Sequence, residues 1–108
     1  MRNGLYRVHF TTPLGMGAGV VHAVDGEMWG GDAGIYYRGT YSVAGDTLKA
    51  TVTTGRHTNL GNIVSVFGKD QVTINIVGQI QGDSVKAKGS SPEAPGLSFG
   101  ADLAFVCD

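Results

Sequence analysis

The first part of the chain alternates between apolar and polar residues with a period of two. Large apolar side chains occupy every second position between Leu5 and Thr11, a pattern typical of a β-strand with one buried face. The residues that follow, TTPLG, have proline and glycine at the positions that a type I turn favours. We therefore predict a hairpin in which Thr12 pairs with Gly15. In this register Phe10 lies opposite Gly17, and its ring covers the glycine.

A second hairpin is predicted at Asp25-Gly26, because a type I′ turn needs positive φ at both central residues and Asp-Gly meets that need. This turn pairs His22 with Trp29 and places both, with Val20, on the face opposite the predicted core. An aromatic residue with apolar neighbours on an outer face can form an association patch. We therefore expect Val20 and Trp29 to belong to a homodimer interface. Alternatively, a loop covers this face, or a slip of one residue in the register places Trp29 in the core.

The rest of the chain continues in short alternating segments separated by turn residues, without a helical period. These segments are Ile35–Val43, Leu48–Val52, Ile63–Phe67, Val72–Ile80, Val85–Ala87 and Phe99–Phe105. Together with the two hairpins they make about eight antiparallel strands in a single domain, residues 1–108. An open sheet of that length would leave its edges exposed, and closure into a barrel removes them. We predict an all-β fold, a small antiparallel up-and-down barrel of about eight strands, in preference to a sandwich.

The glycine content supports a strongly curved sheet. Glycine makes up 18 of the 108 residues and is spaced irregularly among β-forming residues. Collagen would need glycine at every third position, and a flexible linker would lack the Val, Ile and aromatic residues seen here. The corners and bulges of a barrel do need glycine.

An eight-stranded barrel encloses space for side chains or for one small ligand. In the predicted register Phe10, Tyr37 and Tyr41 point inward. A cavity that remained between them would be apolar with a few phenolic hydroxyls, which suits an acyl chain or an aromatic molecule. Alternatively, Phe99, Phe105 and the aliphatic residues fill the interior completely.

Charge and cysteine content narrow the class of protein further. The net charge is −1 and basic residues form no cluster, so direct binding of nucleic acid is not expected. Cys107 is the only cysteine and cannot form an internal disulfide. No apolar run reaches membrane-spanning length, and no apolar leader precedes the first strand. We expect a soluble, cytoplasmic protein without membrane contact.

Residues that could carry chemistry are few. Asp32 lies in the glycine-rich stretch WGGDAG, but a phosphate loop would need a following helix and a nearby lysine. We expect Asp32 to cap backbone N–H groups in a turn instead. His9 and His22 lie roughly 13 Å apart along the first hairpin, too far for a shared metal ion. With no paired carboxylates, no Ser-His-Asp arrangement and no activated cysteine, we expect no catalytic residues, no metal, no cofactor and no enzymatic activity.

Several segments together resemble the GrlR-like family. They are NGLYRVHF, DGEMWGGD, YRGTYS with a following Gly-Asp turn, SVFG, and a later hairpin with a Gly-Asp turn. The resemblance covers nearly the whole chain. Members of this family are small intracellular barrels of lipocalin-like appearance, described as negative regulators of type III secretion that sequester a transcriptional activator.

The resemblance implies a homodimer and a partner-binding element in the turn after the YxG strand. The corresponding residues in this chain are Val43, Ala44 and Asp46. The family's better-known pattern has an acidic run there, which is reduced to Asp46 in this sequence. We therefore expect a non-enzymatic regulatory protein that binds a transcriptional activator through this hairpin. The alternative is a carrier or sensor that holds a small apolar ligand in the barrel interior.

Overall fold

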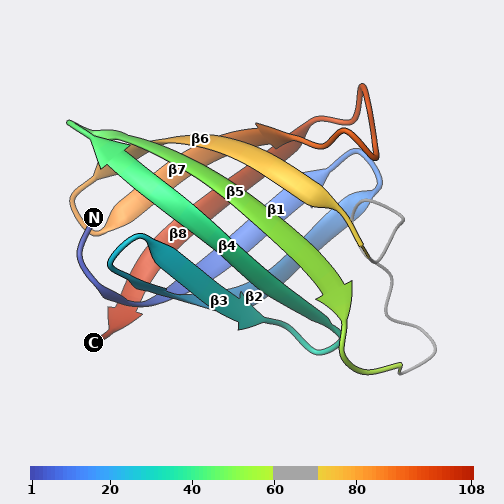
Figure 1. The fold of residues 1–108 in the computed structure, drawn as a ribbon, viewed down its shortest axis with the longest axis horizontal. Coiled ribbons are helices and arrows are strands. Elements are labelled where there is room, and N and C mark those ends of the chain that lie inside the picture. The colour runs from blue at the N-terminus through green and yellow to red at the C-terminus, as the bar shows by residue number, and fades with distance from the viewer. Residues whose placement is uncertain (60–70) are drawn as a thin grey trace.

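The alternating segments form eight antiparallel strands in the computed structural model, which describes residues 1–59 and 71–108 (Figure 1). The strands are β1 (Gly4–Thr12), β2 (Gly15–Val24), β3 (Glu27–Gly31), β4 (Ile35–Ala44), β5 (Thr47–Arg56), β6 (Thr73–Gln81), β7 (Ser84–Ser90) and β8 (Phe99–Cys107). Each strand pairs with its neighbours in sequence, and β1 also pairs with β8, which closes the barrel. The predicted all-β, up-and-down barrel is confirmed. The segment Ile63–Phe67 lies outside the described residues.

The first hairpin has the predicted register. Thr12 pairs with Gly15, and Phe10 lies opposite Gly17. The Phe10 ring packs directly over this glycine, since a Cβ atom at Gly17 would lie 2.6 Å from the ring. The interior of the barrel therefore accommodates a phenylalanine where the facing strand has no side chain.

The second hairpin also follows the sequence pattern. Asp25 and Gly26 have φ values of 49° and 88°, the positive values that the type I′ turn requires. His22 lies opposite Trp29 as predicted, and Trp29 is 42% exposed. The alternative in which Trp29 belongs to the core is therefore wrong.

The inward faces of the strands form one hydrophobic core. Alternate residues of every strand contribute to it, as the period of two predicted. Its buried members include Tyr6, Val8, Val21, Ala23, Met28, Leu48, Ala50, Val52, Ile74, Val85, Ala87, Phe99, Ala101 and Leu103. Among the described residues no helix is long and apolar enough to cross a membrane.

Side chains pack together at the end of the barrel where both termini lie (Figure 1). The Tyr6 hydroxyl donates a hydrogen bond to the carbonyl oxygen of Arg2, and the Tyr6 and Phe105 rings meet edge to face, 5.5 Å apart. The Arg2 guanidinium lies 3.8 Å from the centre of the Phe105 ring and pairs with Asp83 and Asp108 at 3.4 and 3.1 Å. These contacts join both ends of the chain to the β6–β7 turn.

Candidate functional site

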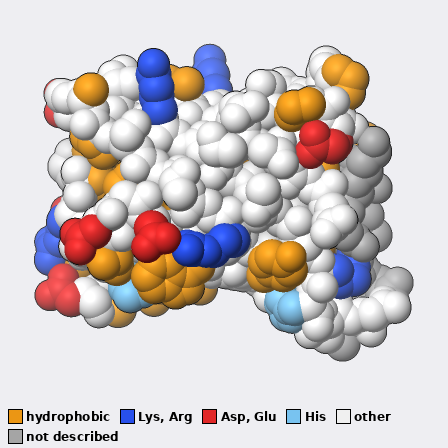
Figure 2. Space-filling model, viewed as in Figure 1, with side chains coloured by type: hydrophobic (Ala, Val, Ile, Leu, Met, Phe, Trp, Pro, Cys, Tyr) orange, Lys and Arg blue, Asp and Glu red, His pale blue; other side chains and the backbone are white. Residues whose placement is uncertain are grey.

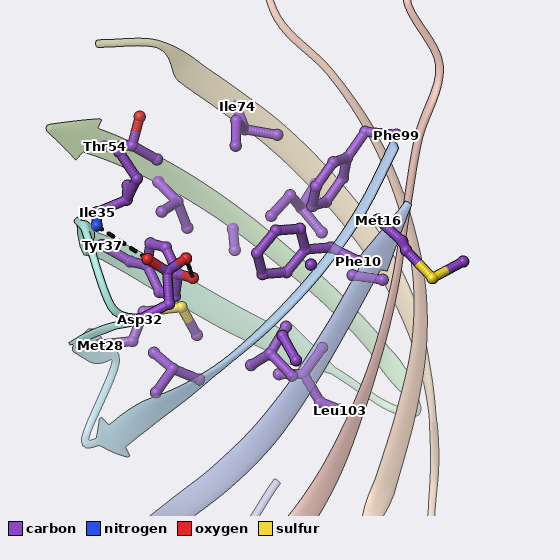
Figure 3. A pocket seen from close by; sticks show the side chains of 18 of the residues that line it. Phe10, Met16, Met28, Asp32, Ile35, Tyr37, Thr54, Ile74, Phe99 and Leu103 are labelled. Atoms are coloured by element: carbon purple, nitrogen blue, oxygen red, sulfur yellow. Dashed lines mark hydrogen bonds between the residues drawn. The ribbon is translucent and has the colours of Figure 1, made fainter. Parts of the chain in front are cut away.

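An apolar cavity of about 410 Å³ occupies the part of the barrel away from the termini. Phe10, Met16 and Phe99 line it near the ends of their strands (Figure 3). Leu48 and Leu103, which are buried core residues, also line it. All the described lining residues are apolar or glycine, except three polar ones discussed below. The described side chains therefore do not fill the interior completely.

The cavity exists because several inward positions carry small side chains. Gly17, Ala50 and Ala101 all line it, and an eight-stranded barrel needs larger residues at most inward positions to fill its interior. The aromatic residues form one wall of this space. The Phe10 ring meets the Tyr37 ring edge to face with 6.0 Å between centres, and stacks with the Phe99 ring at 6.2 Å.

The three polar lining residues are Asp32, Tyr37 and Thr54. Asp32 lies in the turn between β3 and β4, and its Oδ1 accepts hydrogen bonds from the N–H groups of Gly34 and Ile35 at 3.0 and 2.9 Å. This is the turn-capping role that the sequence predicted. The carboxylate also does something that the sequence did not reveal: its Oδ2 accepts a hydrogen bond from the Tyr37 hydroxyl.

The surroundings of Tyr37 favour the protonated form of its hydroxyl. Burial raises the pKa of its hydroxyl far above the usual range, and the hydrogen bond to Asp32 and the negative charge of that carboxylate raise it further. The phenol therefore remains protonated at all physiological pH values and acts as a permanent donor to Asp32. The polar corner is a carboxylate held by three donors, two from the backbone and one from the side chain of Tyr37.

The turn that carries Asp32 is held from outside by residues that follow β5. The N–H of His57 donates to the carbonyl oxygen of Gly34 at 2.9 Å. Its ring Nε2 lies 2.9 Å from the carbonyl oxygen of Asp32, and its Nδ1 lies 2.6 Å from the hydroxyl of Thr58. His57 therefore positions the turn. No local sequence pattern indicates this contact, because His57 and Asp32 are 25 positions apart.

The residues predicted to line a cavity do not all do so. Phe10 and Tyr37 line it, but Tyr41 is absent from the lining. Tyr41 is half-buried and packs against the core, four residues further along β4 than Tyr37 and towards the β4–β5 turn. Alternation predicts that both tyrosines point inward, but only Tyr37 lies at the depth of the cavity.

The outer face around Trp29 is exposed, as predicted. Val20 and Trp29 are 43% and 42% exposed. The His22 ring lies edge-on to Trp29 at 5.1 Å, and the Arg38 guanidinium lies 5.7 Å from the Trp29 ring while it pairs with Glu27 at 2.9 Å. Figure 2 shows hydrophobic side chains gathered over β3 beside acidic, basic and histidine side chains. The homodimer itself stays a prediction.

The hairpin predicted to bind a partner is separate from the cavity. Val43, Ala44 and Asp46 come together at the tip between β4 and β5, and all three are exposed. This tip lies at the end of the barrel that also carries the β2–β3 and β6–β7 turns, whereas Asp32 lies at the opposite end. A ligand in the cavity and a protein at this tip would therefore not compete for the same residues.

Among residues 1–59 and 71–108, no three His, Cys, Asp or Glu side chains are placed to hold a metal ion. No family model matches the chain, and no curated protein matches it. The eight-stranded antiparallel barrel agrees with the fold that the GrlR-like resemblance implies. Neither comparison assigns the chain to a family.

Proposed function

We propose that this barrel is a non-enzymatic binding protein that carries or senses a small apolar molecule in its interior. The observation that carries the proposal is the cavity of about 410 Å³ with its apolar lining. Pockets for small ligands typically measure about 300–1,000 Å³ and combine apolar walls with a few placed polar groups. Asp32, Tyr37 and Thr54 are such groups here.

The test is binding of a neutral, environment-sensitive probe such as N-phenylnaphthylamine, followed by fluorescence. We expect saturable binding of one probe per barrel. Ala50→Leu should weaken it by about tenfold or more, because a larger side chain at a lining position occupies the space of the ligand. Ala104→Leu is the matched control, since Ala104 lies on β8 outside the cavity lining.

Three outcomes of this experiment would be informative. Loss of binding in Ala50→Leu with retention in Ala104→Leu would support an interior ligand. Binding that is equal in both variants would place the probe on the outer surface and contradict the proposal. Failure of the wild-type protein to bind the probe, together with no small molecule in native mass spectra of protein purified from its host, would also contradict it.

A second function is favoured by a different observation, the exposed hairpin tip. We propose that Val43, Ala44 and Asp46 bind a transcriptional activator, as the GrlR-like resemblance implies. Val43 is 39% exposed, and side chains that project from a rigid hairpin are a frequent place for partner contacts. The single carboxylate of Asp46 would supply charge complementarity to a basic surface, which usually affects association rate and salt dependence more than affinity.

This second proposal is tested by co-purification from the native host. Val43→Asp combined with Asp46→Lys should abolish recovery of the activator without lowering thermal stability. Leu14→Asp is the matched control, because Leu14 is 64% exposed in the turn of a different hairpin. Recovery of an activator that binds the double variant unchanged would refute the assignment of the hairpin.

A further inference from the structure

Among the described residues that line the cavity, the only charged side chain is negative. Asp32 is a carboxylate, and the described lining contains no Lys, Arg or His side chain. A ligand with its own carboxylate would bring a second negative charge to this corner without a counter-charge. Like charges at short distance in a partly desolvated site are unfavourable. The cavity is therefore poorly suited to a fatty acid, although its apolar walls would accept an acyl chain.

The Asp32 carboxylate is an oriented acceptor with remaining capacity. An ionised carboxylate offers about four acceptor positions, and three donors are seen here: Gly34, Ile35 and Tyr37. The two backbone bonds fix Oδ1, so Oδ2 is the atom that can accept one more hydrogen bond. Figure 3 shows Asp32, Tyr37 and Ile35 together on one side of the pocket, with Phe10 and Phe99 further across it.

A group of aromatic rings extends across the pocket from this acceptor, beginning with Tyr37, whose hydroxyl donates to Asp32. Phe10, Tyr37 and Phe99 form a connected group of rings with centres 6.0 and 6.2 Å apart. The faces of aromatic rings attract ammonium groups, and the attraction increases when the group is partly desolvated. A carboxylate beside aromatic rings therefore favours an ammonium head over a neutral hydroxyl, while the aliphatic part of the cavity takes the apolar tail.

We propose that the cavity selects an apolar amine, whose ammonium group donates a hydrogen bond to Asp32 beside the aromatic wall while its hydrocarbon tail lies among the core side chains. This inference rests on the proposed function, since it assigns the chemical class of the interior ligand. It predicts a preference among three molecules with the same tail: octylamine binds best, octanol is intermediate and octanoate is weakest.

The experiment is displacement of N-phenylnaphthylamine by each of the three octyl compounds, checked by calorimetry with the compound alone. We expect octylamine to bind at least about tenfold more tightly than octanoate, the effect of one nearby opposite charge. Asp32→Asn should reduce this preference to about twofold or less, because an amide keeps an oxygen for the backbone N–H groups but removes the charge. Binding of octanol should hardly change.

The matched control is Asp102→Asn, which removes the same charge from the outer face of β8, where Asp102 is exposed between the inward Ala101 and Leu103. It should keep the full preference for octylamine. Tyr37→Phe frees Oδ2 of one donor, so binding of octylamine should stay equal or become tighter. If Asp32→Asn does not fold, the ranking of the three compounds on the wild-type protein and on Tyr37→Phe still tests the inference.

The outcomes distinguish this inference from the proposed function. Equal binding of all three compounds, or tightest binding of octanoate, would refute the assignment of an amine while leaving an interior apolar ligand in place. If Asp102→Asn abolished the preference for octylamine as completely as Asp32→Asn, the preference would be an effect of the net charge of the protein. That result would refute the role of Asp32. Failure of every compound and of the probe to bind would refute the proposed function itself.

Discussion

Replacement of Asp32 by alanine removes the acceptor of three hydrogen bonds, those from the N–H groups of Gly34 and Ile35 and from the Tyr37 hydroxyl. Hydrogen bonds to charged groups contribute about 1.5–3 kcal/mol each when buried. The two backbone donors resemble those at a helix N-cap, where loss of the acceptor costs about 1 kcal/mol. Because Asp32 is only partly buried, we expect a total loss of about 2–3 kcal/mol. For a domain of this size, that corresponds to a decrease in Tm of roughly 10 °C.

A double-mutant cycle separates the contribution of Tyr37 from that of the backbone. Asp32→Ala, Tyr37→Phe and the double variant are unfolded in urea, with the far-ultraviolet strand signal as the readout. We expect Tyr37→Phe alone to cost about 1 kcal/mol, the net value of one such bond. In the Asp32→Ala background it should cost almost nothing, which gives a coupling energy of about 1 kcal/mol. Asp32→Asn, which keeps an oxygen for Gly34 and Ile35, should lose less stability than Asp32→Ala.

Two results would refute this reasoning. If Asp32→Ala changed the free energy of unfolding by less than about 0.5 kcal/mol, the typical range for surface substitutions, the carboxylate would not hold the turn. If the effects of Asp32→Ala and Tyr37→Phe were additive, the hydroxyl of Tyr37 would not depend on Asp32.

Three further predictions concern packing, association and pH. Gly30→Ala should destabilise the barrel by at least about 1–3 kcal/mol, because its Cβ would clash with the carbonyl oxygen of Val20. Gly100→Ala, whose Cβ meets nothing within 4 Å, should be tolerated in the same urea titration. Trp29→Ala should shift a dimer towards monomer in sedimentation, since an interface tryptophan often contributes about 2 kcal/mol or more; a wild-type protein that is monomeric at high concentration would contradict this. Because the pKa of Tyr37 is raised in the folded state, the folded protein keeps a proton that the unfolded chain releases above about pH 10. The free energy of unfolding should therefore fall as the pH rises beyond that value, and less steeply in Tyr37→Phe; equal slopes would show that Tyr37 is not responsible.

The strands and their registers could be predicted because short turns determine them locally. Asp25-Gly26 can form only a tight hairpin, and that turn then determines that His22 faces Trp29. The capping by Asp32 was also predictable, since it depends on residues two and three positions away. In each case the physical cause lies within a few residues of the effect.

The cavity could not be derived in this way. Alternation predicts which side chains point inward, but not how deeply each lies or whether neighbouring rings fill the space between them. Tyr37 and Tyr41 are equivalent in the pattern, yet only Tyr37 lines the cavity and reaches Asp32. The contact of His57 with the Asp32 turn depends on how β5 pairs with β4, which brings together residues 25 positions apart. These features follow from the curvature of the whole barrel.

The pairing of β1 with β8 has a consequence for the order of events during synthesis. All the other pairings join strands that follow one another, so they can form as the chain emerges from the ribosome. Leu5, in contrast, can pair with Cys107 only after nearly the whole chain has been synthesised. Until then the nascent sheet carries β1 as an unpaired edge, and such edges readily add strands from other molecules. Closure also brings together the most distant parts of the chain, a slow step for a β-rich topology. A nascent chain whose synthesis stops before Phe99 would therefore form an open, aggregation-prone sheet rather than a smaller barrel.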